Sequence, residues 1–277
     1  MTAETRSLVL RQIMAVQALE LRKRFLGRRS ILVYLLALIP LGLTGMRMLA
    51  ILFLHMMEHS IAQDQVEYAV LFRTLILRFV VYFGCVAVFV PLFRGDILDR
   101  SLHYYLLAPL TRRTLTIAKY LSGLAAALFL FNGTTLATWL LWYGGHGPAA
   151  LIDRATSGHG LAELGAYLLV TTLACIGYGA AFLAAGVYFR NPIFPALLFL
   201  GWELINIFLP PVLKSLSLIH YLESLCPVSV PPDSGIAILA DPASPWVAIP
   251  GLLALAAVLV ALAAAKARRL EVLYGIE

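Results

Sequence analysis

Long runs of apolar residues alternate with shorter polar segments along most of the chain. Each run holds about 20 or more residues with few charges, which is the length that an α-helix needs to cross the hydrocarbon core of a bilayer. The runs cover approximately residues 30–54, 69–93, 115–143, 161–189, 193–213 and 246–265. The pattern therefore predicts an all-α, polytopic membrane protein with six transmembrane helices.

The segment before the first run has an amphipathic pattern. Apolar side chains recur there at helical spacing, at Leu10, Met14, Ala18, Leu21 and Phe25. Seven Lys and Arg residues share the segment, so it is too charged to span a bilayer and is expected to lie along the membrane interface. We expect no cleavable signal peptide, because this charged helix precedes any apolar core. The chain is thus divided into an interfacial helix at residues 1–29 and a transmembrane domain at residues 30–277.

Composition and charge support this assignment and give it an orientation. Hydrophobic residues make up 61% of the chain, charged residues 13%, and the mean hydropathy is +0.87, values far from those of a soluble domain. The net charge of +6 does not point to nucleic acid, because the basic residues follow the ends of the apolar runs. Of the 21 Lys and Arg residues, 16 fall in segments that the six-span plan assigns to one side. Basic residues concentrate on the cytoplasmic side of membrane proteins, which predicts that both termini are cytoplasmic. We expect the membrane to be a bacterial inner membrane.

A histidine–glutamate pattern after the first run offers an enzymatic alternative. His55, Glu58 and His59 form the sequence H-x-x-E-H, which in inverted zinc peptidases supplies two metal ligands and a general base. The pattern lies where a span would leave the membrane, and the three cysteines add no ligand spacing. We favour a polar interface over an intramembrane metallopeptidase, and expect no metal site and no catalytic residue.

Polar side chains inside the apolar runs are candidates for a transport path. Arg78, Asn132, Glu203 and Asn206 occupy such positions. A carboxylate at mid-membrane is protonated, paired or in contact with an aqueous cavity, so Glu203 also suits an ion-coupled secondary transporter. The alternative is that these groups form a structural hydrogen-bond network between helices.

The polar segment at residues 94–119 separates the second and third runs. It contains seven ionisable side chains and one histidine, and it must lie in water. Gly95-Asp96 offers a helix N-cap, Asp99 would follow in the first turn, and Pro109 would end the helix. Thr111 offers a second N-cap ahead of the third run. We expect a short amphipathic helix with one face on the membrane and the other toward a partner.

Two stretches of the sequence resemble the permease subunits of type-2 ABC exporters. The first is G-D-I-L-D-R-S-L-H-Y-Y-L-L-A-P-L-T-R-R-T-L-T-I-A-K, which is similar to the first cytoplasmic loop of that family. Its matching residues are Asp99, Arg100, Leu102, Tyr105, Leu106, Leu107, Pro109, Arg112, Arg113 and Lys119. The second is W-E in the fifth run followed by L-P and H-Y-L, with matches at Trp202, Glu203, Leu209, Pro210, Leu218, His220, Tyr221, Leu222 and Pro227.

The resemblance implies a function that depends on partners. In this family the first loop is a coupling helix that docks on an ATP-binding subunit, which implies partner-binding roles for Asp96, Asp99, Arg100, His103, Tyr104, Pro109 and Arg112. It also implies two ATPase subunits that carry ATP and Mg, and a second permease subunit, identical or different. The chain itself has no G-x-x-x-x-G-K-[ST] loop, so no cofactor and no ATP site are expected on it. The implied activity is export of an unidentified substrate.

Overall fold

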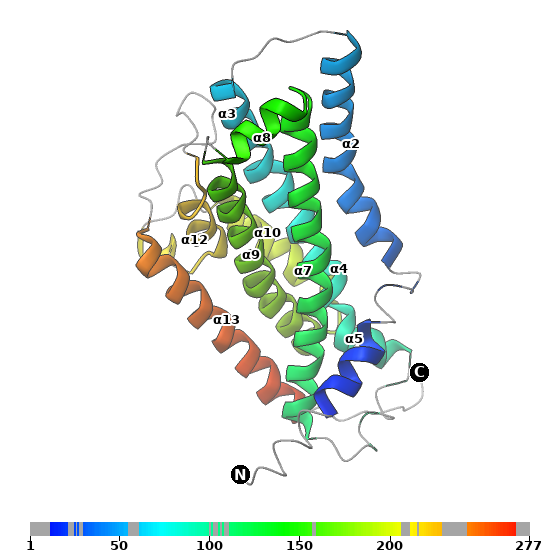
Figure 1. Cartoon of the computed structure of the whole chain (residues 1–277). Coiled ribbons are helices and arrows are strands. Elements are labelled where there is room, and N and C mark those ends of the chain that lie inside the picture. The colour runs from blue at the N-terminus through cyan, green and yellow to red at the C-terminus, as the bar shows by residue number, and fades with distance from the viewer. Residues whose placement is uncertain are drawn as a thin grey trace, which may run out of the picture.

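The computed structural model describes residues 12–21, 25, 27, 30–54, 61–99, 101, 105, 107, 111–156, 159–205, 211–214, 216–228 and 243–269. Within these residues the regular structure is entirely helical, and the long helices run side by side in one bundle (Figure 1). The helices, in chain order, are α2 (Ser30–Leu54), α3 (Ile61–Leu71), η1 (Phe72–Val81), α4 (Tyr82–Phe89), α5 (Pro91–Leu98), α7 (Arg112–Gly144), α8 (Pro148–Thr156), α9 (Gly160–Tyr188), α10 (Ile193–Ile205), α11 (Pro211–Lys214), α12 (Leu218–Ser224) and α13 (Pro245–Ala267). A further helical segment covers residues 12–21.

Five helical stretches are long and apolar enough to cross a membrane. They are Ser30–Phe53, Gln63–Leu98, Arg112–Gly144, Gly160–Tyr188 and Pro245–Arg268. They confirm the prediction of a polytopic helical membrane protein and correspond to five of the six expected spans. For the remaining one, at residues 193–213, α10 provides 13 residues, residues 206–210 lie outside the description, and α11 follows. A sixth span therefore stays a prediction.

Helix α9 forms the centre of the bundle, where it packs against α7, α13 and α4 (Figure 1). Its small residues allow close approach of neighbouring helices, as is common in lipid. A Cβ atom at Gly186 would lie 2.7 Å from the carbonyl oxygen of Val90, and one at Gly179 would lie 2.4 Å from the ring of Phe89. Any side chain at these two positions would push the end of the second span away from α9.

Helix α2 lies at the edge of the bundle and presents an apolar face to the outside. Ile31, Leu35, Leu38 and Phe53 are all more than half exposed. Large apolar patches of this kind are rare on soluble monomers and mark contact with lipid or with another subunit.

The second span is longer than predicted and contains a π-helix. Its helical run continues from Gln63 to Leu98, and the central ten residues, Phe72–Val81, have the wider π-helical turn. Long π-helical stretches are uncommon, and those that occur are frequent at functional sites. This one carries Arg73 and Arg78.

Of the two helix caps expected within residues 94–119, one is wrong and one is confirmed, and the expectation that the whole segment lies in water is wrong for Asp96 and Lys119, which are buried. No helix begins at Gly95-Asp96, because Asp96 is an interior residue of α5, and Asp99 follows that helix as its C-cap. The helix continues because the Asp96 carboxylate is paired within the bundle, as shown below. Thr111 is confirmed as the N-cap of α7, where its hydroxyl accepts a hydrogen bond from the Thr114 backbone N–H at 3.2 Å.

Candidate functional site

A buried ion cluster joins three segments at the end of the bundle that contains α5, hereafter the α5 end. The Lys119 ammonium donates to Glu20 Oε1 at 2.6 Å and to Asp96 Oδ2 at 2.5 Å. The Tyr105 hydroxyl donates to the same Glu20 oxygen at 3.0 Å. We call Glu20, Asp96 and Lys119 the charged triad. It links the helix at residues 12–21, the last turn of the second span and the start of the third.

Each member of the triad is placed by its helix and removed from water. Lys119 is fully buried, and Glu20 and Asp96 are nearly so. The Lys119 ammonium also lies 4.5 Å from the centroid of the Tyr105 ring, within the range of a cation–π contact. Charges buried this deeply are tolerated only when they are paired and hydrogen-bonded. The triad therefore fixes the relative positions of the three segments.

A cavity opens beside the triad. It has a volume of about 390 Å³ and is lined by residues of α2, α4, α5, α7 and the N-terminal segment. Glu20, Asp96 and Asp99 give its wall acidic groups, whereas Val33 and Leu130 are among its apolar residues. Its volume is within the usual range for sites of small ligands.

The structure separates the residues predicted to bind a partner. Asp96 is buried in the triad, whereas Asp99 is exposed at the end of α5. Arg112 donates to the carbonyl oxygens of Arg268 at 2.9 Å and Ala267 at 3.4 Å, so it ties the start of α7 to the end of α13. The other four predicted residues, Arg100, His103, Tyr104 and Pro109, lie outside the described residues.

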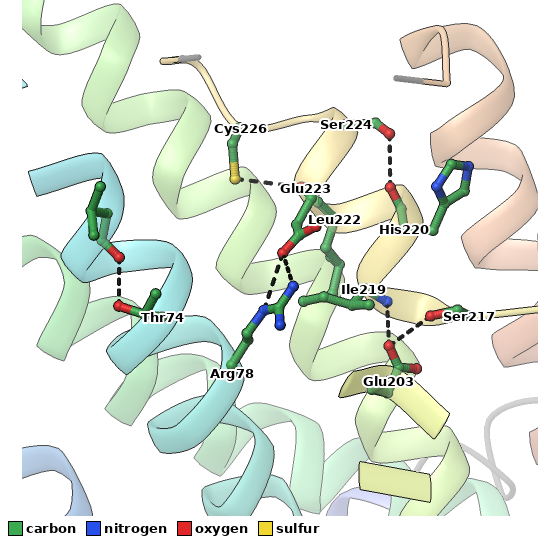
Figure 2. Close-up of polar contacts among 11 residues, drawn as sticks. Thr74, Arg78, Glu203, Ser217, Ile219, His220, Leu222, Glu223, Ser224 and Cys226 are labelled. Atoms are coloured by element: carbon green, nitrogen blue, oxygen red, sulfur yellow. Dashed lines mark hydrogen bonds and ion pairs between the residues drawn. The ribbon is translucent and has the colours of Figure 1, made fainter. Parts of the chain in front are cut away.

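A second polar cluster surrounds α12 and contains Glu203 (Figure 2). The Glu203 carboxylate accepts hydrogen bonds from the Ser217 hydroxyl at 2.8 Å and from the backbone N–H groups of Leu218 and Ile219 at 3.0 and 2.9 Å. These N–H groups belong to the first turn of α12, where the helix has no internal partner for them. Glu203 thus caps α12 from α10, a neighbouring segment, and its carboxylate is held by three donors.

Arg78 contacts the other end of the same short helix. Its guanidinium donates to Glu223 Oε1 through Nη2 at 2.5 Å and through Nε at 3.1 Å (Figure 2). Five residues earlier, about one turn of the π-helix, Arg73 donates to the carbonyl oxygen of Val228 at 2.6 Å. The two arginines therefore hold α12 and the segment after it against the second span.

Arg78 and Glu203 line the same small cavity, together with Tyr82 and Tyr178. Its volume is about 10 Å³. A cavity of this size holds at most about one water molecule. Asn132 is not part of this group, because its amide donates to the Thr172 hydroxyl at 3.0 Å between α7 and α9. Asn206, the remaining candidate for a transport path, lies outside the described residues.

Sequence analysis missed the acidic partners of these basic groups. Glu20 belongs to a helix that was interpreted from its apolar and basic residues. Glu223 comes directly after the H-Y-L motif and was not considered as an ion-pair partner. Sequence analysis also missed two ion pairs at the opposite end of the bundle, where Arg47 pairs with Asp64 and Arg154 pairs with Glu163. An Arg in or beside a span needs a carboxylate, a backbone carbonyl or water as its partner, so the arginines in the sequence indicated that such partners should be sought.

Two groups near α12 have shifted pKa values. Burial raises the pKa of the Cys226 thiol to about 12, although the nearby charge of Arg73 opposes the shift. Burial, helped by the positive charge of Lys214, lowers the pKa of His220. Both groups are therefore neutral at pH 7, which suits their partly enclosed positions.

No site for a metal is evident among the residues that the structure describes, since they hold no cluster of three or more potential ligands. His55, Glu58 and His59 lie outside them, so the metallopeptidase alternative is not addressed by this observation. The chain matches no family model, and neither a search of curated proteins nor a search of solved structures finds a match. The fold itself defines the class as a polytopic helical membrane protein.

Proposed function

We propose that this chain is the membrane subunit of an ATP-driven exporter and that a separate ATPase subunit supplies its energy. The observation that supports this proposal most is the charged triad at the α5 end. It joins the second and third spans on either side of residues 99–111, the part that lies between α5 and α7 of the loop at residues 94–119, which the resemblance identifies as the coupling loop. In the proposed orientation this end faces the cytoplasm, consistent with its excess of basic residues.

The triad would turn a force on this segment into movement of two spans together. The segment follows α5 directly and leads directly into α7. Because Lys119 bonds to both Asp96 and Glu20, a shift of α5 is transmitted to α7 and to the helix at residues 12–21. Coupling of this kind requires that the ATPase contact the segment differently in its nucleotide-bound and nucleotide-free states. Two such subunits and two ATPases would form the complete exporter.

The geometry of Glu203 favours the exporter over an ion-coupled secondary transporter. Its carboxylate is occupied by three donors of the α12 cap, and the adjoining cavity has room for about one water. These contacts suit a structural role for Glu203, which the exporter interpretation allows and an ion site at Glu203 does not.

Affinity purification of the tagged chain from its native membrane in mild detergent tests the proposal. We expect a co-purifying subunit and Mg-dependent ATP hydrolysis in the eluate, while an eluate of the same chain purified in a harsh detergent should lack both. A pure single-chain preparation that drives flux from a pH gradient without ATP would contradict the exporter and support the secondary transporter.

A further inference from the structure

Two cysteines from different helices meet in the core of the bundle. Cys85 belongs to α4 in the second span, and Cys175 belongs to the middle of α9. Neither residue is exposed, neither forms a disulfide, and the two side chains are hydrogen-bonded to each other. Because the two residues are far apart in sequence, it is the packing of α4 on α9 that brings their sulfur atoms together.

Helices α4 and α9 stay in close contact beyond this pair. Phe89 and Gly179 come one helical turn further along each helix, and a Cβ atom at Gly179 would lie 2.4 Å from the Phe89 ring. Further on, the main chain of Val90 contacts Gly186. Disulfides require Cα atoms within about 7 Å of each other, and glycine at helix contacts allows such close approach. The two cysteines therefore lie in an interface of the kind that a disulfide can bridge.

The helices that carry the two thiols offer no charge to pair with. Helix α4 contains no Asp, Glu, Lys, Arg or His, and α9 contains only Glu163, twelve residues before Cys175. Tyr120 of α7 lies close to both thiols, but its hydroxyl donates to the carbonyl oxygen of Ile176 at 2.9 Å. A thiolate, or a metal ion held by two thiolates, would bury charge here at high cost. Sulfenic acid or a glutathione adduct would add atoms to a closed core. A disulfide adds neither charge nor atoms.

We propose that Cys85 and Cys175 are a redox pair whose oxidised form is a disulfide that ties the second span to α9. Both S–H bonds break, one S–S bond forms, and two electrons and two protons leave the site. A lipid-soluble quinone is the class of oxidant that accepts all four, because it is reduced to the quinol, and it approaches the bundle through the bilayer. The reaction leaves no charge in the apolar core. This assignment is independent of the proposed exporter function, because it rests on the two thiols and the packing of their helices.

The disulfide would act on the span that leads into the predicted coupling loop. Cys85 lies in the helical run Gln63–Leu98, which ends with α5. A covalent bond to α9 would hold this run against the centre of the bundle. Because both sulfur atoms are covered, an oxidant contacts them only while α4 and α9 move apart. The rate of oxidation should therefore be limited by this movement, and the oxidised chain should no longer make it.

Mapping of linked peptides and counting of free thiols measure the reaction directly. The reduced chain in lipid nanodiscs is treated with decylbenzoquinone or with glutathione disulfide, denatured, labelled with N-ethylmaleimide and digested. The chain has three cysteines, so the untreated form should take three labels. After the quinone we expect one label, on Cys226, and a peptide pair linked through Cys85 and Cys175 that dithiothreitol separates. Glutathione disulfide, which is polar and stays outside the bilayer, should form no such link.

Single substitutions provide matched controls. Cys226→Ala removes the third thiol and should form the same link, whereas Cys85→Ala and Cys175→Ala each remove one partner and should keep both remaining thiols after the quinone.

Iodine, a small oxidant that joins thiols already in contact, decides between the outcomes. No link after either the quinone or iodine would show that the two sulfur atoms do not meet. A link after iodine alone, or a quinone attached to one cysteine, would refute the redox pair. A link that glutathione disulfide forms as fast as the quinone would contradict the enclosed position of the thiols, and a link between two chains would contradict the pairing within one.

Discussion

The Lys119 ammonium and the Asp96 carboxylate form an ion pair at 2.5 Å between the start of the third span and the end of the second. Asp96 and Lys119 are 23 positions apart in sequence, and residues 99–111, the part of the predicted coupling loop between α5 and α7, lie between them. The two ends of this segment are therefore anchored to each other inside the bundle. Any displacement of the segment acts on both spans at the point where they are joined.

Replacing Lys119 with Met should destabilise the protein strongly. The variant leaves the carboxylates of Glu20 and Asp96 buried without the cation between them, which costs about 3–5 kcal/mol. The free energy of unfolding in mixed detergent micelles measures the effect. Arg113→Met, which removes an exposed cation at the same end of the bundle, should change it by less than about 0.5 kcal/mol. A comparable small loss for Lys119→Met would show that the triad does not hold the segments together.

Replacing Glu203 with Ala should release the first turn of α12. Three donors lose their acceptor, and each buried unsatisfied group costs about 1–3 kcal/mol. Glu203→Gln keeps a side-chain oxygen that accepts one or two of these bonds, so it should lose less. Hydrogen exchange of the Leu218 and Ile219 amides would report the release at the residues concerned. Unchanged exchange in Glu203→Ala would contradict the capping role.

Arg78 and Glu223 should be energetically coupled. Their ion pair is partly screened from water, and a double-mutant cycle with Arg78→Met and Glu223→Gln should give a coupling free energy of about 1–3 kcal/mol. Pairing Arg113→Met with Glu223→Gln provides the control, since these residues belong to distant helices and their effects should add. Additive effects for Arg78 and Glu223 would mean that this pair does not hold α12 against the π-helix.

Cys226 should react slowly with maleimide in the folded protein. Its pKa of about 12 leaves a thiolate fraction of about 10⁻⁴ at pH 8, against about one tenth for an ordinary thiol. The reaction rate should rise about tenfold for each pH unit through the range in which the protein stays folded. The rate is measured on a variant in which Cys226 is the only cysteine, by stopping the labelling reaction at set times at several pH values. Rapid labelling that is insensitive to pH would contradict the enclosed position of the thiol.

The extent to which the sequence predicted this structure differs between its apolar and polar parts. Five of the spans follow from runs of apolar residues, because the bilayer requires a fixed length of helix. The Thr111 cap also follows from local chemistry. By contrast, the continuation of the second span through Gly95 and Asp96 depends on Lys119, which is distant in sequence. A local pattern favoured a new helix there, and a long-range ion pair overrode it.

The interpretation of Glu203 shows the same limit. Its depth in an apolar run identified it as a residue that needs an explanation, but the sequence left both a transport path and a structural network open. The structural role follows from the hydrogen bonds that Glu203 accepts from the Ser217 hydroxyl and from two backbone N–H groups of α12. A pattern of side chains in the sequence does not reveal these contacts. The acidic residues Glu20 and Glu223 were missed because the helices that bring them to Lys119 and Arg78 are far away in sequence.

The most direct test of the central claim is the ATPase activity that co-purifies with a tagged Asp99→Arg variant of the chain. Asp99 is exposed at the start of the proposed coupling segment, and Asp153→Arg makes the same charge reversal at an exposed position of α8, at the opposite end of the bundle. We predict that wild-type chain and Asp153→Arg retain a partner with Mg-dependent ATPase activity, whereas Asp99→Arg retains less than about a tenth of it, because a like charge at a docking contact costs more than 1.4 kcal/mol. Equal ATPase activity in the two variants, or none with the wild-type chain, would contradict the account.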